Sequence, residues 1–230
     1  MTYPNIREGI FRARSNRFIA QVEIGEIGGR LETVHVKNTG RCKELLVPGA
    51  RVYLNRPDNP ARVTKYDLVA VRKGERLINM DSNAPNIAFF EYLQSGKYID
   101  GVTFIKPEAK HGDSRFDFYV EVGPRKVFIE VKGVTLEENG VVLFPDAPTL
   151  RGVKHLNELA RCVGKGYEAQ VVFVIQMSDV RYFTPNNATH PAFGAALAAA
   201  EAGGVKVVAL DCAVTPDSMT IGNPVPVRLE

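Results

Sequence analysis

The sequence contains no apolar run close to the roughly 20 residues that a membrane-spanning helix requires. Its first residues, Met1 to Arg7, carry neither an apolar core nor a cleavage signal for export. We therefore expect a cytoplasmic protein. Its cysteines are few, odd in number and far apart, which excludes a disulfide framework and a zinc-binding pattern; they are Cys42, Cys162 and Cys212.

Several common catalytic motifs are also missing. No Gly-x-Gly-x-x-Gly precedes an expected helix and no Gly-Lys-Ser/Thr occurs, so a nucleotide cofactor is not expected. No serine lies in a nucleophile elbow, which argues against a serine hydrolase. The net charge is +3 and the isoelectric point about 8.7, a mild excess of base that permits a nucleic-acid partner without requiring one.

The first third of the chain has the pattern of a small all-β unit. Alternating apolar and polar residues, separated by glycine and proline turns, predict five short strands there. These strands are Arg17–Ile24, Arg30–Val36, Arg51–Leu54, Asp67–Arg72 and Arg76–Met80. A short turn or helix is expected at Cys42–Leu46. Five strands with one small helix fit a closed barrel such as the OB-fold.

The remainder alternates helices with strands. The polar, turn-rich segment Asp81–Asn86 marks a domain boundary, which gives units of residues 1–82 and 83–230. Helical spacing predicts helices at Ile87–Gln94, Thr149–Val163 and Pro191–Gly203, with Thr149 as a cap. Strands are expected near residues 101–106, 115–122, 127–134, 140–144, 170–176 and 205–210, and a surface tail from Thr215. The second unit is therefore an α/β domain with a mixed sheet.

Two of these strands carry an acidic pattern. Asp117 lies in the first, Gly123-Pro124 forms a turn, and the second carries Glu130 and Lys132 two residues apart. Side chains two apart on a strand share a face, so a hairpin would bring two carboxylates and an ammonium group together. Carboxylates hold hard cations, and a cation with a lysine beside it can activate water against a phosphodiester. An acid-x-lysine triplet on a strand also has a purely structural interpretation, as a solvent-exposed strand face.

The order of helix, three strands, helix and strand around these residues resembles the core of the PD-(D/E)xK nuclease superfamily. Two further segments narrow the resemblance. His35–Arg41 with Lys43–Leu46 and Pro48-Gly49, and Phe144–Thr149 running into Arg151–Leu156, are similar to signature segments of the sugar fermentation stimulation protein A family. The resemblance covers nearly the whole chain. It implies an N-terminal OB-fold joined to a nuclease-like domain, non-specific DNA binding, and a regulatory link to sugar metabolism, especially maltose.

The resemblance also implies a magnesium or manganese ion as cofactor. Asp117 and Glu130 would bind it, with the Val131 carbonyl as a third ligand, and Lys132 would assist the attacking water. Many members of the wider superfamily add an acidic ligand from the first core helix, where Glu91 is the local candidate. Asp146 is either a turn residue, since Pro and Asp favour turns, or a further member of the acidic pocket.

The basic candidates also keep two interpretations. Arg151, Lys154 and His155 at the start of a helix form either a solvated face, with Lys154 and Glu158 as an i,i+4 pair, or contacts to phosphate. Lys37, Asn38 and Arg41 of the barrel either contact DNA or belong to a structural turn capped by Asn38 or Thr39. Phe18 and Tyr53 are either base-stacking residues or core residues.

Three functional hypotheses follow from these patterns. The first is a DNA-binding, metal-dependent nuclease, and the second is a non-catalytic DNA-binding regulator of sugar (maltose) metabolism genes. The third is an RNA-processing or repair accessory protein, since OB-folds bind either polymer. A homodimer is common among nucleases that cut two strands, but no sequence feature marks an interface.

Overall fold

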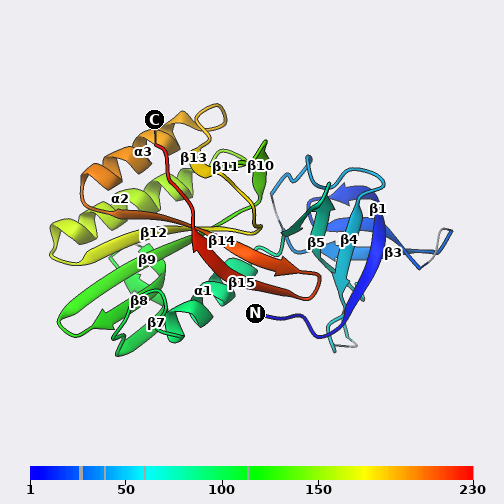
Figure 1. Cartoon of the computed structure of the whole chain (residues 1–230), viewed down its shortest axis with the longest axis horizontal. Helices are drawn as coiled ribbons and strands as arrows, with labels where there is room; N and C mark the ends of the chain where they lie inside the picture. The colour runs from blue at the N-terminus through cyan, green and yellow to red at the C-terminus, as the bar shows by residue number, and fades with distance from the viewer. Residues whose placement is uncertain (26–27, 39, 60, 113, 230) are drawn as a thin grey trace.

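The computed structural model describes residues 1–25, 28–38, 40–59, 61–112 and 114–229. A β-barrel and a larger α/β domain lie side by side, and the N-terminus lies between them (Figure 1). Within the described ranges, every helix is too short or too polar to cross a lipid bilayer.

The barrel is a closed ring of five strands, which confirms the expected OB-fold. Its strands are β1 (Ile6–Asn16), β2 (Ile19–Ile24), β3 (Arg30–Val36), β4 (Arg51–Asn55) and β5 (Asp67–Lys73). They pair in the order β3-β2-β1-β4-β5, and a parallel pairing of His35 with Asp67 and of Val36 with Leu68 closes the ring. Fully buried apolar side chains fill it, among them Phe11, Val22, Val34 and Leu54.

The barrel differs from expectation at its first strand. β1 was not predicted, whereas the predicted fifth strand is β6 (Arg76–Asn79), a hairpin extension beyond the ring. Register shifts between Phe11 and Ala13 and between Arg14 and Asn16 interrupt the alternation of β1. A β-bulge of this kind moves side chains to the other face, so the sequence loses its period of two.

The second domain is an α/β unit built on a mixed sheet, as expected. Its six strands pair in the order β15-β14-β12-β9-β8-β7. They are β7 (Phe104–His111), β8 (Ser114–Val122), β9 (Arg125–Val134), β12 (Glu168–Ile175), β14 (Lys206–Thr215) and β15 (Ser218–Pro224). β12 runs parallel to β9 and to β14, and the outer pairs are antiparallel.

Helices cover both faces of this sheet (Figure 1). α1 (Ala84–Gln94) packs on one face, and α2 (Leu150–Gly164) with α3 (Pro191–Ala202) packs on the other. The expected Thr149 cap of α2 is confirmed, since its hydroxyl accepts the Gly152 N–H at 3.0 Å. α1 begins three residues earlier than predicted, because Pro85 lies in its first turn, where proline is favoured.

Two short strands, β10 (Leu136–Glu138) and β13 (Tyr182–Pro185), were not predicted from the sequence. They form a separate small sheet with β11 (Val141–Phe144), which is the strand expected near residues 140–144. The tail expected on the surface after Thr215 is in fact an edge strand, β15, paired with β14. Proline and glycine make β13 and β15 look like loops, yet edge strands tolerate both residues.

Both apolar packing and hydrogen bonds join the two domains, and one cluster of buried apolar side chains runs through both. The Gln176 side-chain amide donates to the carbonyl oxygens of Asn79 and Asp81 at 3.0 and 3.1 Å. The Lys37 ammonium lies 2.9 Å from the buried Asp81 carboxylate. Thr2 forms a β-bridge with Ser218, so the first residues of the chain contact the second domain. These contacts hold the barrel in a defined orientation beside the sheet.

Candidate functional site

Asp117 lies where the pairing of β8 with β9 stops. The ladder runs from Val122 opposite Arg125 to Phe118 opposite Ile129, one position before Asp117 and Glu130 would meet. At this point a side chain takes the place of a main-chain carbonyl as acceptor: Asp117 Oδ2 accepts the Val131 N–H at 2.7 Å. The side chain is therefore fixed at the opening between the two strands.

A residue of α1 completes the support of Asp117. The Asn86 side-chain amide donates to Asp117 Oδ1 at 2.8 Å. α1 is held against β8 by Phe89 and Phe90, whose ring centroids lie 5.8 and 5.9 Å from that of Phe118. Sequence reasoning missed Asn86 because it assigned this residue to the domain linker; the proline before it was the available signal for a helix start.

Glu130 is the most buried charged group of the site, with 3% of its surface exposed. Its Oε1 accepts from the Lys132 ammonium at 2.5 Å and from His155 Nδ1 of α2. Its Oε2 is buried and has no hydrogen-bond partner among the described residues. A buried carboxylate oxygen without a partner is costly, so this atom marks a place for a ligand.

Arg151 and His155 join the site through Glu130. Arg151 Nε lies 3.4 Å from His155 Nε2, one turn apart on α2. Since the guanidinium can only donate, Nε2 accepts, and the ring hydrogen then lies on Nδ1 and points to Glu130. Lys154 is exposed on the same turn of the helix. The start of α2 thus places two of its three predicted basic residues next to the acidic pair.

The two carboxylates are shifted in opposite directions. Burial, then the negative charge of Glu130, raises the pKa of Asp117. Burial also acts to raise the pKa of Glu130, but the hydrogen bond from His155 and the charge and hydrogen bond of Lys132 outweigh it and leave that pKa lowered. The neighbours of Glu130 therefore keep it ionised. The hydrogen bonds to Asp117 do not offset the effect of its burial, so its pKa stays raised.

This donor set fits a hard divalent cation. Glu130 Oε2 is available, and Asp117 carries the second carboxylate at the same break in the ladder. In the part of the chain that the structure describes, no group of three or more His, Cys, Asp or Glu side chains is arranged to hold a metal. The remaining ligands would be water and main-chain oxygen, such as the predicted Val131 carbonyl, which magnesium and calcium accept readily.

The two other acidic candidates lie elsewhere. Asp146 Oδ2 accepts the Arg41 N–H of the barrel at 3.2 Å, and it borders a cavity of about 130 Å³ between the domains. Glu91 on α1 is 53% exposed in its side chain and pairs with the Met1 amino group at 2.6 Å. The contacts of Asp146 therefore join the barrel to the second domain, and those of Glu91 hold the N-terminus.

The barrel candidates form one braced loop. Asn38 accepts the Gly40 N–H at 2.7 Å and donates to the Met80 carbonyl at 2.9 Å. The Arg14 guanidinium donates to four carbonyl oxygens, those of Arg17, Asn38, Gly40 and Arg41. Asn38 thus caps this turn, as one of the two structural interpretations expected; Thr39, the other candidate cap, lies outside the described residues.

The side chains of this surface differ in how far they reach solvent. Arg41 is exposed, whereas Lys37 is tied to Asp81 with 26% of its side chain accessible. Phe18 is 48% exposed beside Arg17, whereas Tyr53 is 5% exposed and belongs to the core. An exposed aromatic ring next to cations is the arrangement that single-stranded nucleic acid uses for stacking.

Comparison with protein families identifies relatives across both domains. A family model described as the sugar fermentation stimulation protein RE domain matches residues 83–218, and one described as the SfsA N-terminal OB domain matches residues 13–80. A sugar fermentation stimulation protein homolog of Desulfitobacterium hafniense (strain Y51) is 61% identical, with 100% of this chain and 99% of the relative covered. A homolog of Clostridium beijerinckii is 56% identical over 100% of both chains.

The fold also matches a solved structure. The structure of Pyrococcus furiosus SfsA in complex with Ca²⁺ superposes with a TM-score of 0.88 at 27% identity. The match covers 99% of this chain and 98% of that chain. Both domains and their connection are thus shared with that protein.

Proposed function

This chain belongs to the sugar fermentation stimulation protein family, and from that membership we propose that it binds nucleic acid and hydrolyses phosphodiester bonds at a divalent-cation site on Asp117 and Glu130. The observation that carries the proposal is the buried, partnerless Oε2 of Glu130. A cation would satisfy this oxygen, whereas an apolar occupant would leave it desolvated.

The cation of the proposal is magnesium or manganese. The Pyrococcus furiosus relative was solved with Ca²⁺, a hard ion that prefers the same oxygen ligands. When bound, such an ion lowers the pKa of a coordinated water and neutralises charge on phosphoryl oxygens.

Each protein group then has a defined task. Asp117, fixed by the Val131 N–H and by Asn86, presents its carboxylate at the break in the ladder. His155 keeps Glu130 ionised and oriented. The Lys132 ammonium, which donates to Glu130, orients the attacking water or stabilises the negative charge that develops on phosphate.

The barrel would hold the nucleic acid. Phe18 would stack on a base, and Arg17 and Arg41 would contact phosphates beside it. Asn38 holds the loop in shape. At the start of α2, beside the acidic site, the exposed Arg151 and Lys154 would contact phosphate, and His155 would support them through its contact with Arg151. Lys37 contacts phosphate only if it leaves Asp81, so Arg41 is the stronger candidate.

A non-catalytic DNA-binding regulator of sugar metabolism genes is the second candidate. Two observations favour it: Lys132 and His155 already occupy Glu130 Oε1, and α1 offers the amide of Asn86 where a third carboxylate would strengthen a metal site. In that case affinity comes from the basic residues alone, and the acidic pair stabilises the fold.

Cleavage assays decide between the two. Labelled single- and double-stranded DNA, with matched RNA, is incubated with the protein in manganese, magnesium or EDTA. We expect metal-dependent cutting that Glu130→Ala and Lys132→Ala abolish and that Glu138→Gln, an exposed control on β10, retains. Binding without cutting in every condition, unchanged by either site variant, supports the regulator; preferential binding of RNA supports a role on that polymer.

A further inference from the structure

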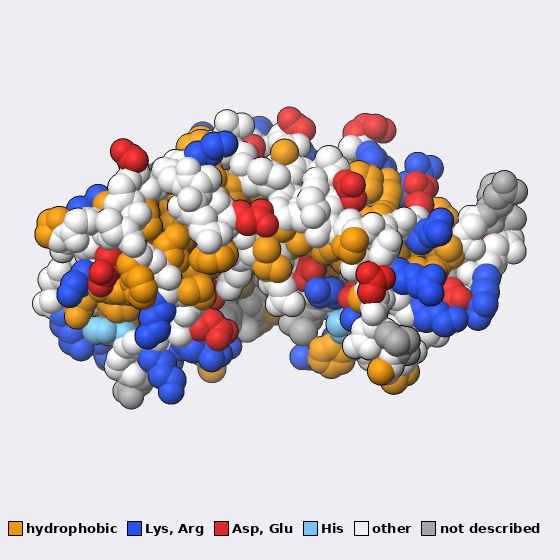
Figure 2. Space-filling view, turned by 90° about the horizontal axis from the view of Figure 1, so that it is seen from below, with side chains coloured by type: hydrophobic (Ala, Val, Ile, Leu, Met, Phe, Trp, Pro, Cys, Tyr) orange, Lys and Arg blue, Asp and Glu red, His pale blue; other side chains and the backbone are white. Residues whose placement is uncertain are grey.

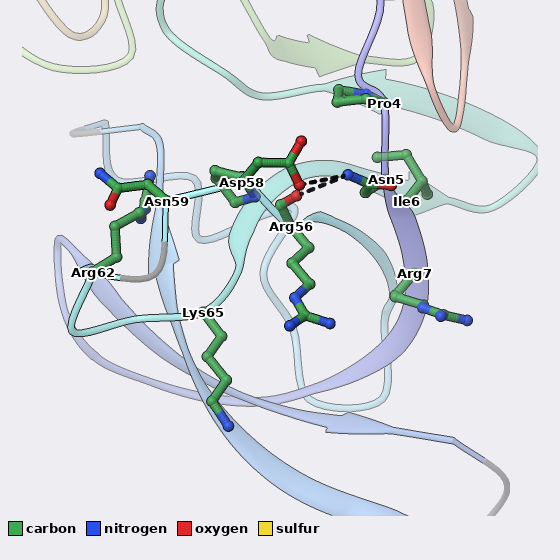
Figure 3. Close-up of a pocket in the computed structure, with 10 residues that line it drawn as sticks. Pro4, Asn5, Ile6, Arg7, Arg56, Asp58, Asn59, Arg62 and Lys65 are labelled. Atoms are coloured by element: carbon green, nitrogen blue, oxygen red, sulfur yellow. Dashed lines mark hydrogen bonds between the residues drawn. The ribbon is translucent and has the colours of Figure 1, made fainter.

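A second polar cavity lies in the barrel, away from the acidic site. It has a volume of about 810 Å³ and lies between the chain at Asn5 to Arg7 and the loop that joins β4 to β5 (Figure 3). This is the opposite end of β1 from Phe18, because Arg7 lies near the start of that strand and Phe18 follows its end. The cavity is therefore separate from the loop at Asn38.

Its charges are almost all of one sign. Arg7, Arg56, Arg62 and Lys65 line it, and the only carboxylate among its described lining residues is Asp58, which accepts from the Asn5 amide at 3.3 Å. Seen from below, Lys and Arg side chains gather over the barrel, with Asp and Glu side chains among them (Figure 2). Like charges held together repel, so the arrangement favours an anionic occupant.

Three of the four cations have no carboxylate partner. Within the described residues, no ion pair includes Arg7, Arg56 or Lys65, and all three are exposed. Other arginines of the barrel are neutralised locally, by pairing with neighbouring glutamates; these are Arg12, Arg30 and Arg51, with Glu23, Glu32 and Glu8. The cavity thus keeps a positive charge that ion pairs cancel at Arg12, Arg30 and Arg51.

The fourth cation is fixed in place. Arg62 pairs with Asp67, which is buried, and its Nε donates to the Thr64 carbonyl at 3.3 Å. Arg56 and Lys65 extend toward the same side of the cavity (Figure 3). The cavity thus brings one anchored guanidinium together with three exposed cations. Arginine side chains recognise phosphate by contacting two of its oxygens at once.

No aromatic side chain is among the described residues that line the cavity. Bases need a stacking surface, whereas phosphates need only cations and hydrogen-bond donors. We propose that this cavity is a phosphate-binding site, in which Arg7, Arg56 and Lys65 contact phosphate oxygens. The phosphate belongs either to a nucleic-acid backbone, which rests on the proposed function, or to a free phosphorylated compound, which does not.

The position of the cavity sets a length requirement for a nucleic-acid ligand. β1 has 11 residues, and at about 3.3 Å per residue it spans at most about 36 Å. Duplex DNA rises about 3.4 Å per base pair, so roughly ten base pairs cover that distance. A duplex of about ten base pairs is therefore long enough to contact the cavity and the surface at Phe18 together.

The test removes the three unpaired cations in the full chain. The variant Arg7→Ala/Arg56→Ala/Lys65→Ala is compared with Arg30→Ala/Arg125→Ala/Arg161→Ala, which removes the same charge from ion-paired positions. Binding to a 20-base-pair duplex is measured by fluorescence anisotropy across salt concentrations. We expect the first variant to lower the salt slope by about 2.7, at about 0.9 for each phosphate contact, and the control to leave it unchanged. A charge-reversed Arg56→Glu/Lys65→Glu variant gives the same readout should the triple variant fold poorly.

Calorimetry with pyrophosphate provides the second arm. Saturable pyrophosphate binding that the triple variant loses, with an unchanged salt slope on DNA, assigns the cavity to a free phosphorylated compound. A salt slope lowered without pyrophosphate binding assigns it to the nucleic-acid backbone. Variants that match the control in both arms overturn the proposal. The triple variant leaves the acidic site intact, so calcium binding measured by calorimetry should persist. A lowered salt slope in a protein that cleaves no DNA would retain the cavity proposal and reject the proposed nuclease.

Discussion

The acidic site of the sheet and the basic surface of the barrel treat charge in opposite ways. At the sheet, Glu130 is 3% exposed and accepts from both Lys132 and His155, so unlike charges are buried and touch. At the barrel, Arg7, Arg56 and Lys65 are exposed and have no carboxylate partner among the described residues. One region neutralises its charges internally, and the other leaves them for a ligand.

The difference follows from what each region would bind. A small hard cation needs oxygen ligands fixed in place, and burial strengthens each interaction while shifting the pKa values of the carboxylates. A polyanion is attracted over a distance through solvent, where salt screens the interaction and no single contact dominates. Substitutions should therefore have large, local effects at the acidic site and smaller, salt-dependent effects on the barrel.

Glu130→Gln should have the largest effect. It removes a charged ligand oxygen, so calorimetry should detect a loss of Mg²⁺, Mn²⁺ or Ca²⁺ affinity of more than about 100-fold. A cation present at about 100 times its dissociation constant should stabilise the wild-type protein by about 2.7 kcal/mol and leave this variant unchanged. Glu138→Gln serves as control. Unchanged affinity in both Glu130→Gln and Asp117→Asn would show that the cation binds elsewhere.

His155 should come next, because it acts through Glu130. His155→Ala removes the donor to Oε1, and loss of such a supporting partner lowers metal affinity by about 10- to 100-fold. His155→Asn, whose side-chain amide can occupy the place of Nδ1, should restore most of the affinity. Equal losses in the two variants would mean that the ring is needed for packing against Phe116 and not for its hydrogen bond.

Phe18 allows the barrel to be tested without changing charge. Phe18→Ala should weaken binding of single-stranded DNA by about 1–3 kcal/mol, the value of one stacked base. Phe104 on β7 is also 48% exposed, so Phe104→Ala is a matched control for lost apolar surface. Equal binding by the two variants would remove stacking from the barrel surface.

Arg41 and Lys37 separate exposed cations from paired ones. Arg41→Ala should lower the salt slope for duplex DNA by about 0.9, the contribution of one phosphate contact. Lys37→Ala should leave the slope unchanged, because its ammonium already pairs with Asp81 at 2.9 Å. The slopes are obtained from the dissociation constant measured at several salt concentrations. A lower slope for Lys37→Ala would mean that Lys37 contacts a phosphate.

The pH dependence of stability should show the smallest effect. The folded-state pKa of Asp117 is raised, so the folded protein retains this proton to a higher pH than the unfolded chain. The contribution of Asp117 to stability therefore falls as pH rises from the ordinary carboxyl range to its raised pKa, and it is constant above that pKa. Asn at this position can still accept the Val131 N–H but does not titrate. The free energy of unfolding of Asp117→Asn should therefore rise relative to that of wild type as pH increases across that range.

Urea unfolding in EDTA at pH values from 3 to 8 measures the free energy of unfolding of both proteins. Asp100→Asn, an exposed aspartate, is the control. A difference between Asp117→Asn and wild type that does not change with pH would show that Asp117 has no raised pKa in the folded protein.

Much of this arrangement could be predicted from patterns of neighbouring residues. The alternation of β2 to β5 predicted a closed barrel, and the hairpin with Glu130 and Lys132 two residues apart predicted a shared face. The bulged β1 and the edge strand β15 could not be predicted, because a register shift and terminal glycine and proline remove the periodic signal.

The partners of the acidic residues were also beyond the sequence. Asn86 and His155 reach Asp117 and Glu130 from helices on opposite faces of the sheet, 31 and 25 residues away along the chain. The cationic cavity likewise joins Arg7 to a loop that begins at Arg56. Spacing along a strand places neighbours on a face, but it carries no information on which distant helix or loop will pack there.

The sequence by itself determined the two fold classes and the chemistry available on β8 and β9, because local periodicity and residue type are properties of neighbouring positions. The tertiary structure alone decided which charges are neutralised and which remain available. Ion pairing depends on distance and burial, and these arise only when β9, α1, α2 and the barrel pack together.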